Sequence, residues 1–292
     1  MADRFPTDWP AWTETPPGAY ILAWEQAQLD RLVGDMFGYH AVQIGLPHLA
    51  ALRESRMSHR TLLLDAALGE APRGADGGPR WPSDAQRPPG IDSIVAGEVL
   101  DLPFATQSVD LLVLPHVLEL SDDPHALLRE AERVLVPEGR LVIVGFNSLS
   151  LWGVRQSVAR MARRSFVPAT QNLIAFTRIK DWIKLLGFEL SRGRFGCYRP
   201  PVASDKWLNR YAFMEKAGDR WWPIFGATFL ITAIKRERGM RLIGPAWKKR
   251  KAVVPALAPV APAAAPRRAS ESGTRASRHE AMKRTDSQTA QQ

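Results

Sequence analysis

The sequence has 292 residues, of which 45% are hydrophobic, and this permits one large α/β domain or two small ones. Residues 245–292 carry ten Lys or Arg against three Asp or Glu and so supply +7 of the net charge of +9. The single cysteine, Cys197, excludes an intramolecular disulfide and a cysteine-based zinc cluster, which fits a reducing compartment.

The N-terminal residues contain no cationic segment that leads into an apolar one, so we expect no secretion signal. The longest apolar-rich run, residues 225–234, is about half of the ~20 residues that a membrane-spanning helix needs. We therefore expect a cytoplasmic protein that has no membrane partner.

The first elements of the chain are a helix and the start of a βαβ unit. Apolar residues recur with helical spacing from Ile21 to Met36, and Gly38 is expected to end this helix. A short apolar run at 40–45 predicts a strand, and residues 47–56 predict a helix that follows it through a glycine.

The next segment combines a strand with a long connection. Residues 61–65 predict a second strand. Residues 67–92 contain too many Gly and Pro residues for a helix, so we expect a long loop there. The run at 109–114 is almost wholly apolar, as expected of a strand that is covered on both faces.

A helix and another strand follow this buried strand. Residues 122–124 read Asp-Asp-Pro, which predicts an N-cap followed by a proline in the first helical turn. The helix ends at the turn 137–139, and the apolar run 141–144 predicts the next strand. Two apolar strands joined by one helix indicate a right-handed crossover in a parallel sheet, and hence an α/β core. The helix residues expected in that core are Leu127, Leu128, Ala131, Val134 and Leu135.

The last third predicts a helix at 177–186, a strand at 188–195 and a final strand at 228–234. Residues 204–222 between these strands form an amphipathic, aromatic-rich segment. Beyond Arg241 the composition changes to Ala, Pro, Ser, Arg and Lys, which cannot bury enough apolar surface to fold.

Four short motifs occur in a fixed order between residues 98 and 139. Residues 98–104 read EVLDLPF, 108–110 read SVD, 123–130 read DPHALLRE and 133–139 read RVLVPEG. Their order and spacing resemble the type 11 domain of the class I S-adenosylmethionine (SAM)-dependent methyltransferases. The chain also resembles a proteobacterial subgroup of these proteins, which has a degenerate glycine-rich first motif, over roughly residues 20–235.

The resemblance implies a Rossmann-like α/β fold. Its mainly parallel seven-stranded sheet would have helices on both faces and an antiparallel last strand. We divide the chain into a segment with an amphipathic helix (1–38), a methyltransferase-like domain (39–240) and a disordered basic, Ala/Pro-rich tail (241–292).

The resemblance also implies where SAM would bind. Glu98 would accept from the adenine amine, beside the Val99 amide, although a lone Glu is more often a solvated loop residue. Asp65, at the end of the second strand, would accept the ribose hydroxyls, or else it is an exposed turn residue. Pro115 would lie next to the cofactor at the end of the fourth strand.

The glycine-rich first loop departs from the family pattern. The family has an acidic residue followed by G-x-G-x-G, whereas residues 43–49 here read QIGLPHL. Gln43, Gly45 and Leu46 would face the cofactor, but Gln43 cannot pair with the SAM ammonium as a carboxylate would. Pro47 has no amide hydrogen, and Leu49 has a branched side chain where the family has glycine.

Two strand ends carry candidates for the chemistry. His116 would face the methyl group in a family-like structure and could accept a proton, or it is a histidine packed at a strand–helix junction. Asn147 and Ser148 would lie near a substrate, although both are also ordinary loop residues. We expect no metal site, because His40, His48 and His59 lack the spacing of metal ligands and are interpreted as structural or exposed.

Two further groups of residues have a structural and a functional interpretation. Six aromatic residues between the last two strands could cover an acceptor, but we expect them to be core. They are Trp207, Tyr211, Phe213, Trp221, Trp222 and Phe225. The basic cluster 248–251 could bind nucleic-acid phosphates, or it is a solvated tail.

The sequence therefore supports three functional hypotheses. The first is a SAM-dependent methyltransferase that acts on a small-molecule acceptor. The second is a non-catalytic member of the fold with a binding or regulatory role, which the altered first loop favours. The third is an RNA-associated methyltransferase that uses the basic tail.

Overall fold

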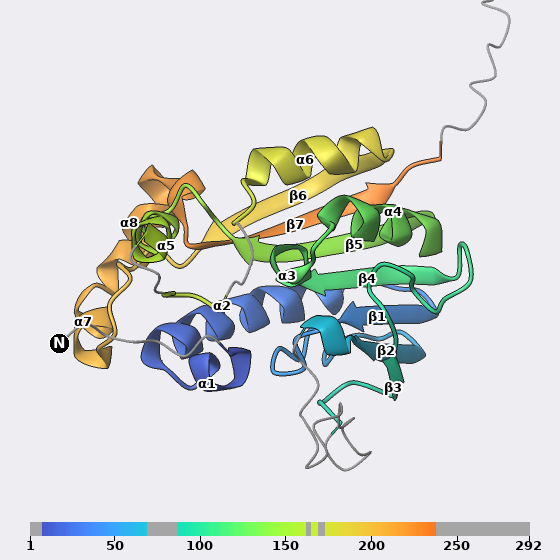
Figure 1. Ribbon diagram of the computed structural model, residues 1–292, viewed down its shortest axis with the longest axis horizontal. Helices are drawn as coiled ribbons and strands as arrows, with labels where there is room; N and C mark the ends of the chain where they lie inside the picture. Colours follow the sequence, from blue (N-terminus) through green and yellow to red (C-terminus); the bar gives the residue numbers. More distant parts are fainter. Residues whose placement is uncertain (1–7, 69–86, 162–164, 169–172, 238–292) are drawn as a thin grey trace, which may run out of the picture. The chain divides into compact units, whose positions relative to one another are not determined.

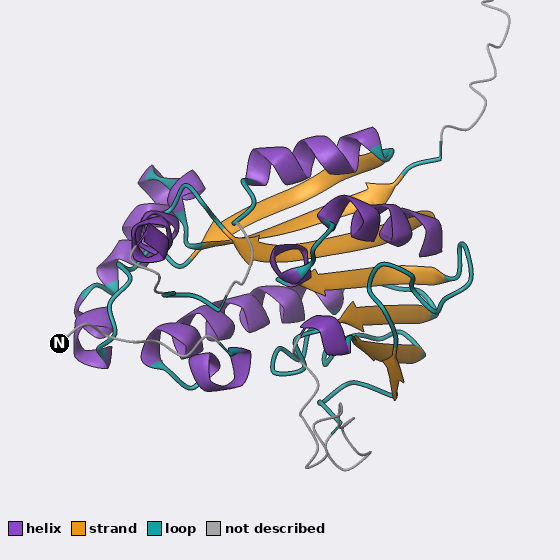
Figure 2. Ribbon diagram, viewed as in Figure 1, coloured by secondary structure: helices purple, strands orange, loops and turns teal. Residues whose placement is uncertain are grey.

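The computed structural model of the chain describes residues 8–68, 87–161, 165–168 and 173–237 (Figure 1). Its strands form one seven-stranded sheet with helices packed against it (Figure 2). The strands are β1 (His40–Ile44), β2 (His59–Leu64), β3 (Ser93–Ala96), β4 (Val109–Pro115), β5 (Leu135–Phe146), β6 (Phe188–Gly196) and β7 (Thr228–Lys235).

The strand order is β3-β2-β1-β4-β5-β7-β6. Strands β1 to β5 pair in parallel, whereas β7 is antiparallel to both β5 and β6. The sequence-based prediction of a mainly parallel α/β sheet with an antiparallel last strand is therefore confirmed. The predicted connection between β4 and β5 through a helix is present, and β5 begins at Leu135, earlier than expected.

The two faces of the sheet belong to two separate hydrophobic clusters, because side chains alternate along each strand. One cluster takes Leu111 and Val113 from β4, and the other takes Leu112 and Leu114. Helices α1, α2 and α5 contribute to the first cluster, α4 and α6 contribute to the second, and the short helix α3 contributes to both. The helices are α1 (Trp9–Thr13), α2 (Pro16–Val33), α3 (Val117–Leu120), α4 (Pro124–Val134), α5 (Leu151–Met161), α6 (Phe176–Leu185), α7 (Asp205–Arg210) and α8 (Phe213–Trp221), with short 3-10 turns η1 (Ala66–Leu68) and η3 (Pro223–Phe225).

Helix α4 shows how the sequence signals act together. The Asp123 carboxylate accepts from the amides of His125 and Ala126, which otherwise have no partner in the first turn. Pro124 occupies the first helical position, where its missing amide hydrogen costs nothing. The inward face then packs on the sheet through Leu127, Leu128, Ala131 and Val134.

The helix predicted at residues 47–56 is wrong, because this stretch forms turns only. In a helix, the carbonyls of Leu46 and Leu49 would accept from amides four residues further along. Here the side-chain amide of Gln43 donates to both carbonyls, at 3.1 and 2.8 Å. A side chain on β1 therefore holds the segment in a compact loop.

The predicted long loop at 67–92 lies partly outside the described residues, and the part at 87–92 contains no helix or strand. The sequence analysis does not identify β3, which follows immediately. This edge strand has four residues, and its two central side chains, Ile94 and Val95, are only half-buried. Such a short pattern cannot be distinguished from a loop without its pairing to β2.

The aromatic residues of the α7–η3 region were expected to be core, and this is wrong. Their exposed fractions reach 49% for Trp207 and 70% for Trp221, and only Tyr211 of the six is half-buried. Helix α8 approaches the sheet through Gly218, where an added Cβ would lie 2.2 Å from the Tyr198 ring. This close contact buries a narrow side of the helix and leaves its aromatic side in solvent.

The basic tail beyond residue 241 lies outside the described residues, so its predicted disorder and phosphate binding stay predictions. In the part of the chain that the structure describes, every helix is too short or too polar to span a bilayer.

Replacement of Leu128 by Ala tests the packing of α4. Because Leu128 is fully buried, we expect the free energy of unfolding to fall by about 2–5 kcal/mol. Urea denaturation followed by circular dichroism measures this change. The exposed neighbour Arg129 provides the control, and an equal loss in Arg129→Ala would contradict the assignment of the buried face.

Candidate functional site

The candidate residues from the sequence lie at one edge of the sheet. Parallel strands place their carboxyl ends together, and β1 to β5 all end at this edge (Figure 1). The candidates are Gln43, Gly45 and Leu46 at β1, Asp65 after β2, Glu98 and Val99 after β3, Pro115 and His116 at β4, and Asn147 and Ser148 after β5.

The turn after β1 is closed by its own side chain. The Gln43 amide nitrogen also donates to the Gly45 carbonyl at 3.0 Å, and its oxygen accepts from the Ala51 amide at 3.0 Å. Gly45 and Leu46 both adopt left-handed backbone, with φ of 68° and 44°. The Leu46 side chain is fully buried. Both polar atoms of the Gln43 side-chain amide are therefore hydrogen-bonded to backbone groups of the protein.

The loops after β2 and β3 are joined by a hydrogen bond. The Val99 amide donates to Asp65 Oδ2 at 2.9 Å, and both residues are buried. Glu98 is exposed, and its backbone pairs with Asp101 in a short bridge. This edge thus presents one exposed and one buried carboxylate on adjacent loops.

His116 lies in the interior between two carboxylates. Its Nε2 is 3.0 Å from Glu25 Oε1 on α2, and its Nδ1 is 3.1 Å from Glu119 Oε2 on α3. The ring is fully buried, and the ring of Trp9 on α1 lies over it with centroids 4.7 Å apart. The ring of Phe146 packs against it at 4.4 Å. Both ring nitrogens are thus engaged by protein atoms.

The two carboxylates are themselves held by backbone and side-chain groups. Thr228 at the start of β7 donates its hydroxyl to Glu25 at 2.6 Å. Glu119 accepts from the Phe146 amide at the end of β5. The histidine–glutamate triad, defined here as Glu25, His116 and Glu119, therefore connects α2, β4, α3, β5 and β7.

The triad holds a positive charge on the imidazole. Burial by itself lowers the pKa of His116, but the carboxylates of Glu25 and Glu119 outweigh burial and raise this pKa to about 10. Burial raises the pKa of the Glu119 carboxyl. At neutral pH His116 is an imidazolium, so it has no free nitrogen to accept a proton.

The residues after β5 are also tied to the backbone. The Asn147 side-chain amide donates to the carbonyls of Ile224 and Gly226, at 2.7 and 2.9 Å, and its oxygen accepts from the Leu149 amide. Asn147 is buried, whereas Ser148 is half-buried. Asn147 thereby fixes the turn before β7.

His40 and His59 begin their strands at the opposite edge of the sheet, whereas His48 lies in the turn after β1. His40, His48 and His59 are exposed, and the rings of His40 and His59 lie 5.1 Å apart. Across the described ranges, no cluster of three His, Cys, Asp or Glu residues is arranged to hold a metal ion.

The sequence resemblance implies SAM as the cofactor, and only its adenosine half matches the residues at this edge. Glu98 is an exposed carboxylate that would accept from an adenine amine, and Asp65 on the next loop is a buried carboxylate that would accept from ribose hydroxyls. The methionine half does not fit, because both polar atoms of the Gln43 amide are bound to backbone and the Gly45–Leu46 turn carries a buried leucine. Trp9 also covers His116.

Sequence reasoning missed Glu25 and Glu119 as partners of His116. A signal for Glu25 was present, since it lies four residues from the buried Ile21 and from the buried Leu29. A charged residue within the apolar stripe of a helix needs a buried partner. The partner itself is 91 residues away, and the helical pattern does not reveal it.

The chain is similar in sequence to a known domain family and to a curated protein. The family model of the type 11 methyltransferase domain matches residues 79–143. The uncharacterized protein YafS of Escherichia coli (strain K12) is 32% identical over 229 residues, which cover 77% of this chain and 80% of YafS.

Solved structures with a similar fold include a SAM-dependent methyltransferase from Archaeoglobus fulgidus. It superposes with a TM-score of 0.49 at 16% identity and covers 73% of this chain and 94% of its own. A Thermotoga maritima protein, a possible histamine N-methyltransferase, superposes with a TM-score of 0.48 at 15% identity and covers 74% and 92%.

The histidine–glutamate triad predicts a pH-dependent stability. The pKa of His116 is raised from 6.5 to about 10 on folding, so its contribution is complete below pH 6.5 and is lost as the pH rises towards 10. We expect the free energy of unfolding to fall by up to about 1.4 kcal/mol per pH unit in this window. Guanidinium denaturation between pH 6 and 10 measures the slope.

The variant Glu25→Gln removes one carboxylate from the triad. It should lower stability at pH 7 by about 3 kcal/mol and reduce the alkaline slope, because the imidazolium loses a buried partner. The exposed Glu54 provides the matched control, Glu54→Gln. An unchanged slope in Glu25→Gln would show that the triad does not hold the charge.

Proposed function

The chain belongs to the class I, type 11 methyltransferase family, whose methyl donor is SAM, and we propose that it methylates a small-molecule acceptor. The observation that supports this best is the pair of carboxylates, Asp65 and Glu98, on neighbouring loops at the carboxyl edge of the sheet. SAM supplies an electrophilic methyl group on a sulfonium, so the protein's main task is alignment.

Each of the two carboxylates has a distinct role in this proposal. Glu98 is exposed and accepts a hydrogen bond from the adenine amine. Asp65 keeps its bond to the Val99 amide and accepts from the ribose hydroxyls. The Asp65–Val99 bond thereby holds the two binding loops in a fixed relation before any ligand arrives.

A small acceptor suits the burial at this edge. Leu46, His116 and Asn147 are all buried where the strands β1, β4 and β5 end. A macromolecular acceptor would need a broad exposed surface there, whereas a small molecule needs only a local opening. The half-buried Ser148 lies closest to solvent among the substrate candidates after β5.

The closed turn after β1 favours a second candidate, a non-catalytic member of the family that binds or regulates. Gln43 bonds to Gly45, Leu46, Leu49 and Ala51, and these bonds use the atoms that would face a bound methionine moiety. A turn stabilised in this way needs no ligand to be stable.

Calorimetric titration with S-adenosylhomocysteine tests the proposal. We expect binding with a Kd on the order of micromolar, and at least about a tenfold weakening in Glu98→Ala, because a charged hydrogen bond is worth roughly 1.5–3 kcal/mol. The nearby exposed Asp101 provides the control, and Asp101→Ala should bind as the unmodified chain does.

The same titration distinguishes the two candidates. Absence of heat at millimolar S-adenosylhomocysteine, from a chain with a normal circular dichroism spectrum, would contradict the methyltransferase proposal and favour the non-catalytic role. Equal weakening in Glu98→Ala and Asp101→Ala would indicate a general charge effect and would contradict the assigned role of Glu98.

A further inference from the structure

Four arginines converge on the sheet face that α2 covers. Together they form the arginine groove: Arg31 on α2, Arg140 on β5, and Arg192 and Arg194 on β6. The groove contains a cavity of about 320 Å³, which is also lined by Gln28, Asp35 and Thr232.

The strand register explains why these side chains share a face. Arg192 lies opposite Thr232 of β7, and Thr232 lies opposite Val142 of β5. Residues directly opposite each other in antiparallel strands point to the same side of a sheet. Arg194 lies two residues after Arg192, and Arg140 lies two residues before Val142, so both also point to the α2 side.

Among the described residues that line the groove, arginines outnumber carboxylates. Within the described residues, none of the four guanidinium groups forms an ion pair with a carboxylate. Arg194 instead donates to the neutral oxygen of Gln28 at 2.6 Å. Of the described residues, Asp35 is the one carboxylate that lines this cavity, and Glu215 and Asp219 line the neighbouring cavity. Four exposed guanidinium groups around one cavity favour an anionic ligand.

Thr232 supplies a second and independent observation. This residue is 2% exposed on the inner strand β7 and lines the same cavity. Its hydroxyl oxygen has no hydrogen-bond partner among the described residues. A buried hydroxyl without a partner costs free energy, and an acceptor oxygen entering the cavity would remove this cost.

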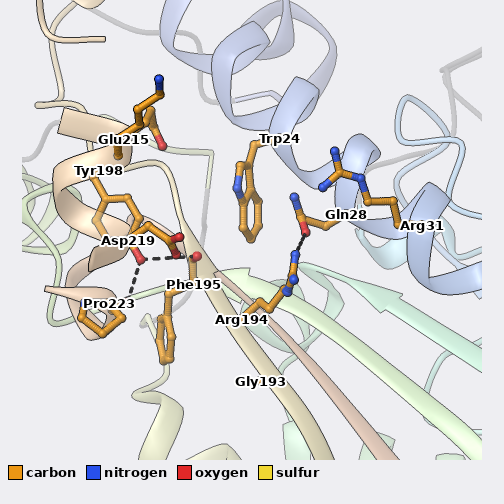
Figure 3. A pocket seen from close by; sticks show the side chains of 11 residues that line it. Trp24, Gln28, Arg31, Gly193, Arg194, Phe195, Tyr198, Glu215, Asp219 and Pro223 are labelled. Atoms are coloured by element: carbon orange, nitrogen blue, oxygen red, sulfur yellow. Dashed lines mark hydrogen bonds between the residues drawn. The ribbon is translucent and has the colours of Figure 1, made fainter. Parts of the chain in front are cut away.

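A neighbouring cavity of about 460 Å³ adds an aromatic wall. It shares Gln28, Arg31 and Arg194 with the first cavity, and it is lined by Trp24 and Tyr198. Figure 3 shows the Trp24 indole between Tyr198 on one side and the Gln28–Arg194 pair on the other. The indole can approach the strand because residue 196 is glycine, where an added Cβ would lie 2.0 Å from the ring.

We propose that the two cavities together bind a nucleotide. The arginine groove and the Thr232 hydroxyl donate to its phosphate oxygens, and the base stacks on Trp24. The phosphate chemistry is common to a free nucleotide and to single-stranded RNA, and the experiment below separates the two.

Titration of the full chain with AMP, with inorganic phosphate and with a labelled ten-nucleotide RNA tests this site. The double variant Arg140→Gln/Arg192→Gln should weaken AMP binding at least tenfold. Trp24→Leu should weaken AMP but leave inorganic phosphate unchanged, because phosphate has no base to stack. The thermal unfolding midpoint of each variant confirms that it is folded.

The control is Arg129→Gln/Arg178→Gln, which removes the same charge from exposed sites on α4 and α6, on the other face of the sheet. Equal weakening of AMP binding in this control would overturn the proposal. The proposal would also be overturned if inorganic phosphate bound as tightly as AMP and Trp24→Leu had no effect on AMP binding. If the Arg140→Gln/Arg192→Gln variant binds RNA as tightly as the unmodified chain, RNA binds elsewhere, for example at the basic tail. This result would overturn the proposal that RNA binds in the groove.

The two remaining results support the proposal and name the ligand. Tighter binding of RNA than of AMP, with the same dependence on Arg140 and Arg192, identifies a polynucleotide. AMP binding without RNA binding identifies a free nucleotide. Neither result depends on S-adenosylhomocysteine binding, so the nucleotide site and the methyltransferase proposal can fail separately.

Discussion

The buried charge of His116 organises the carboxyl edge of the sheet. An imidazolium in a dry interior is stable only between anionic partners, and here α2 supplies Glu25 while α3 supplies Glu119. The bonds from Thr228 and the Phe146 amide extend the constraint to β7 and β5. Helix α2 is therefore attached to the centre of the sheet. Helix α1 packs beside it, and its Trp9 ring covers the His116 ring.

This constraint limits which residues remain for ligands. His116, Gln43 and Asn147 occupy the ends of β4, β1 and β5, where open α/β sheets usually bind their substrates. All three engage protein atoms with both ends of their side chains. On the loops after β2 and β3, Glu98 is exposed, whereas Asp65 is buried and accepts from the Val99 amide. A nucleoside fits these loops better than a methionine tail fits the closed turn.

The sequence predicted the elements whose side chains follow a period, and it predicted which strand ends would meet. Helix α4 is an example, because its buried residues recur with helical spacing, and the continuous apolar run of strand β4 was equally readable. The closed turn after β1 was not predictable, since its structure depends on one amide reaching four backbone groups. The partner of His116 was not predictable either, because Glu25 is brought to it only by the docking of α2. Long-range polar contacts leave no periodic trace in a sequence.

The arginine groove has a competing physical explanation. β6 is an edge strand, and charged residues on edge strands prevent pairing with another chain. Edge protection accounts for Arg192 and Arg194, but not for Arg140, because β5 is an interior strand with partners on both sides. It also leaves the Thr232 hydroxyl unexplained, since a threonine buried on an interior strand protects no edge. An anion in the groove would account for all four positions at once, because it neutralises the guanidinium groups and accepts from the buried hydroxyl.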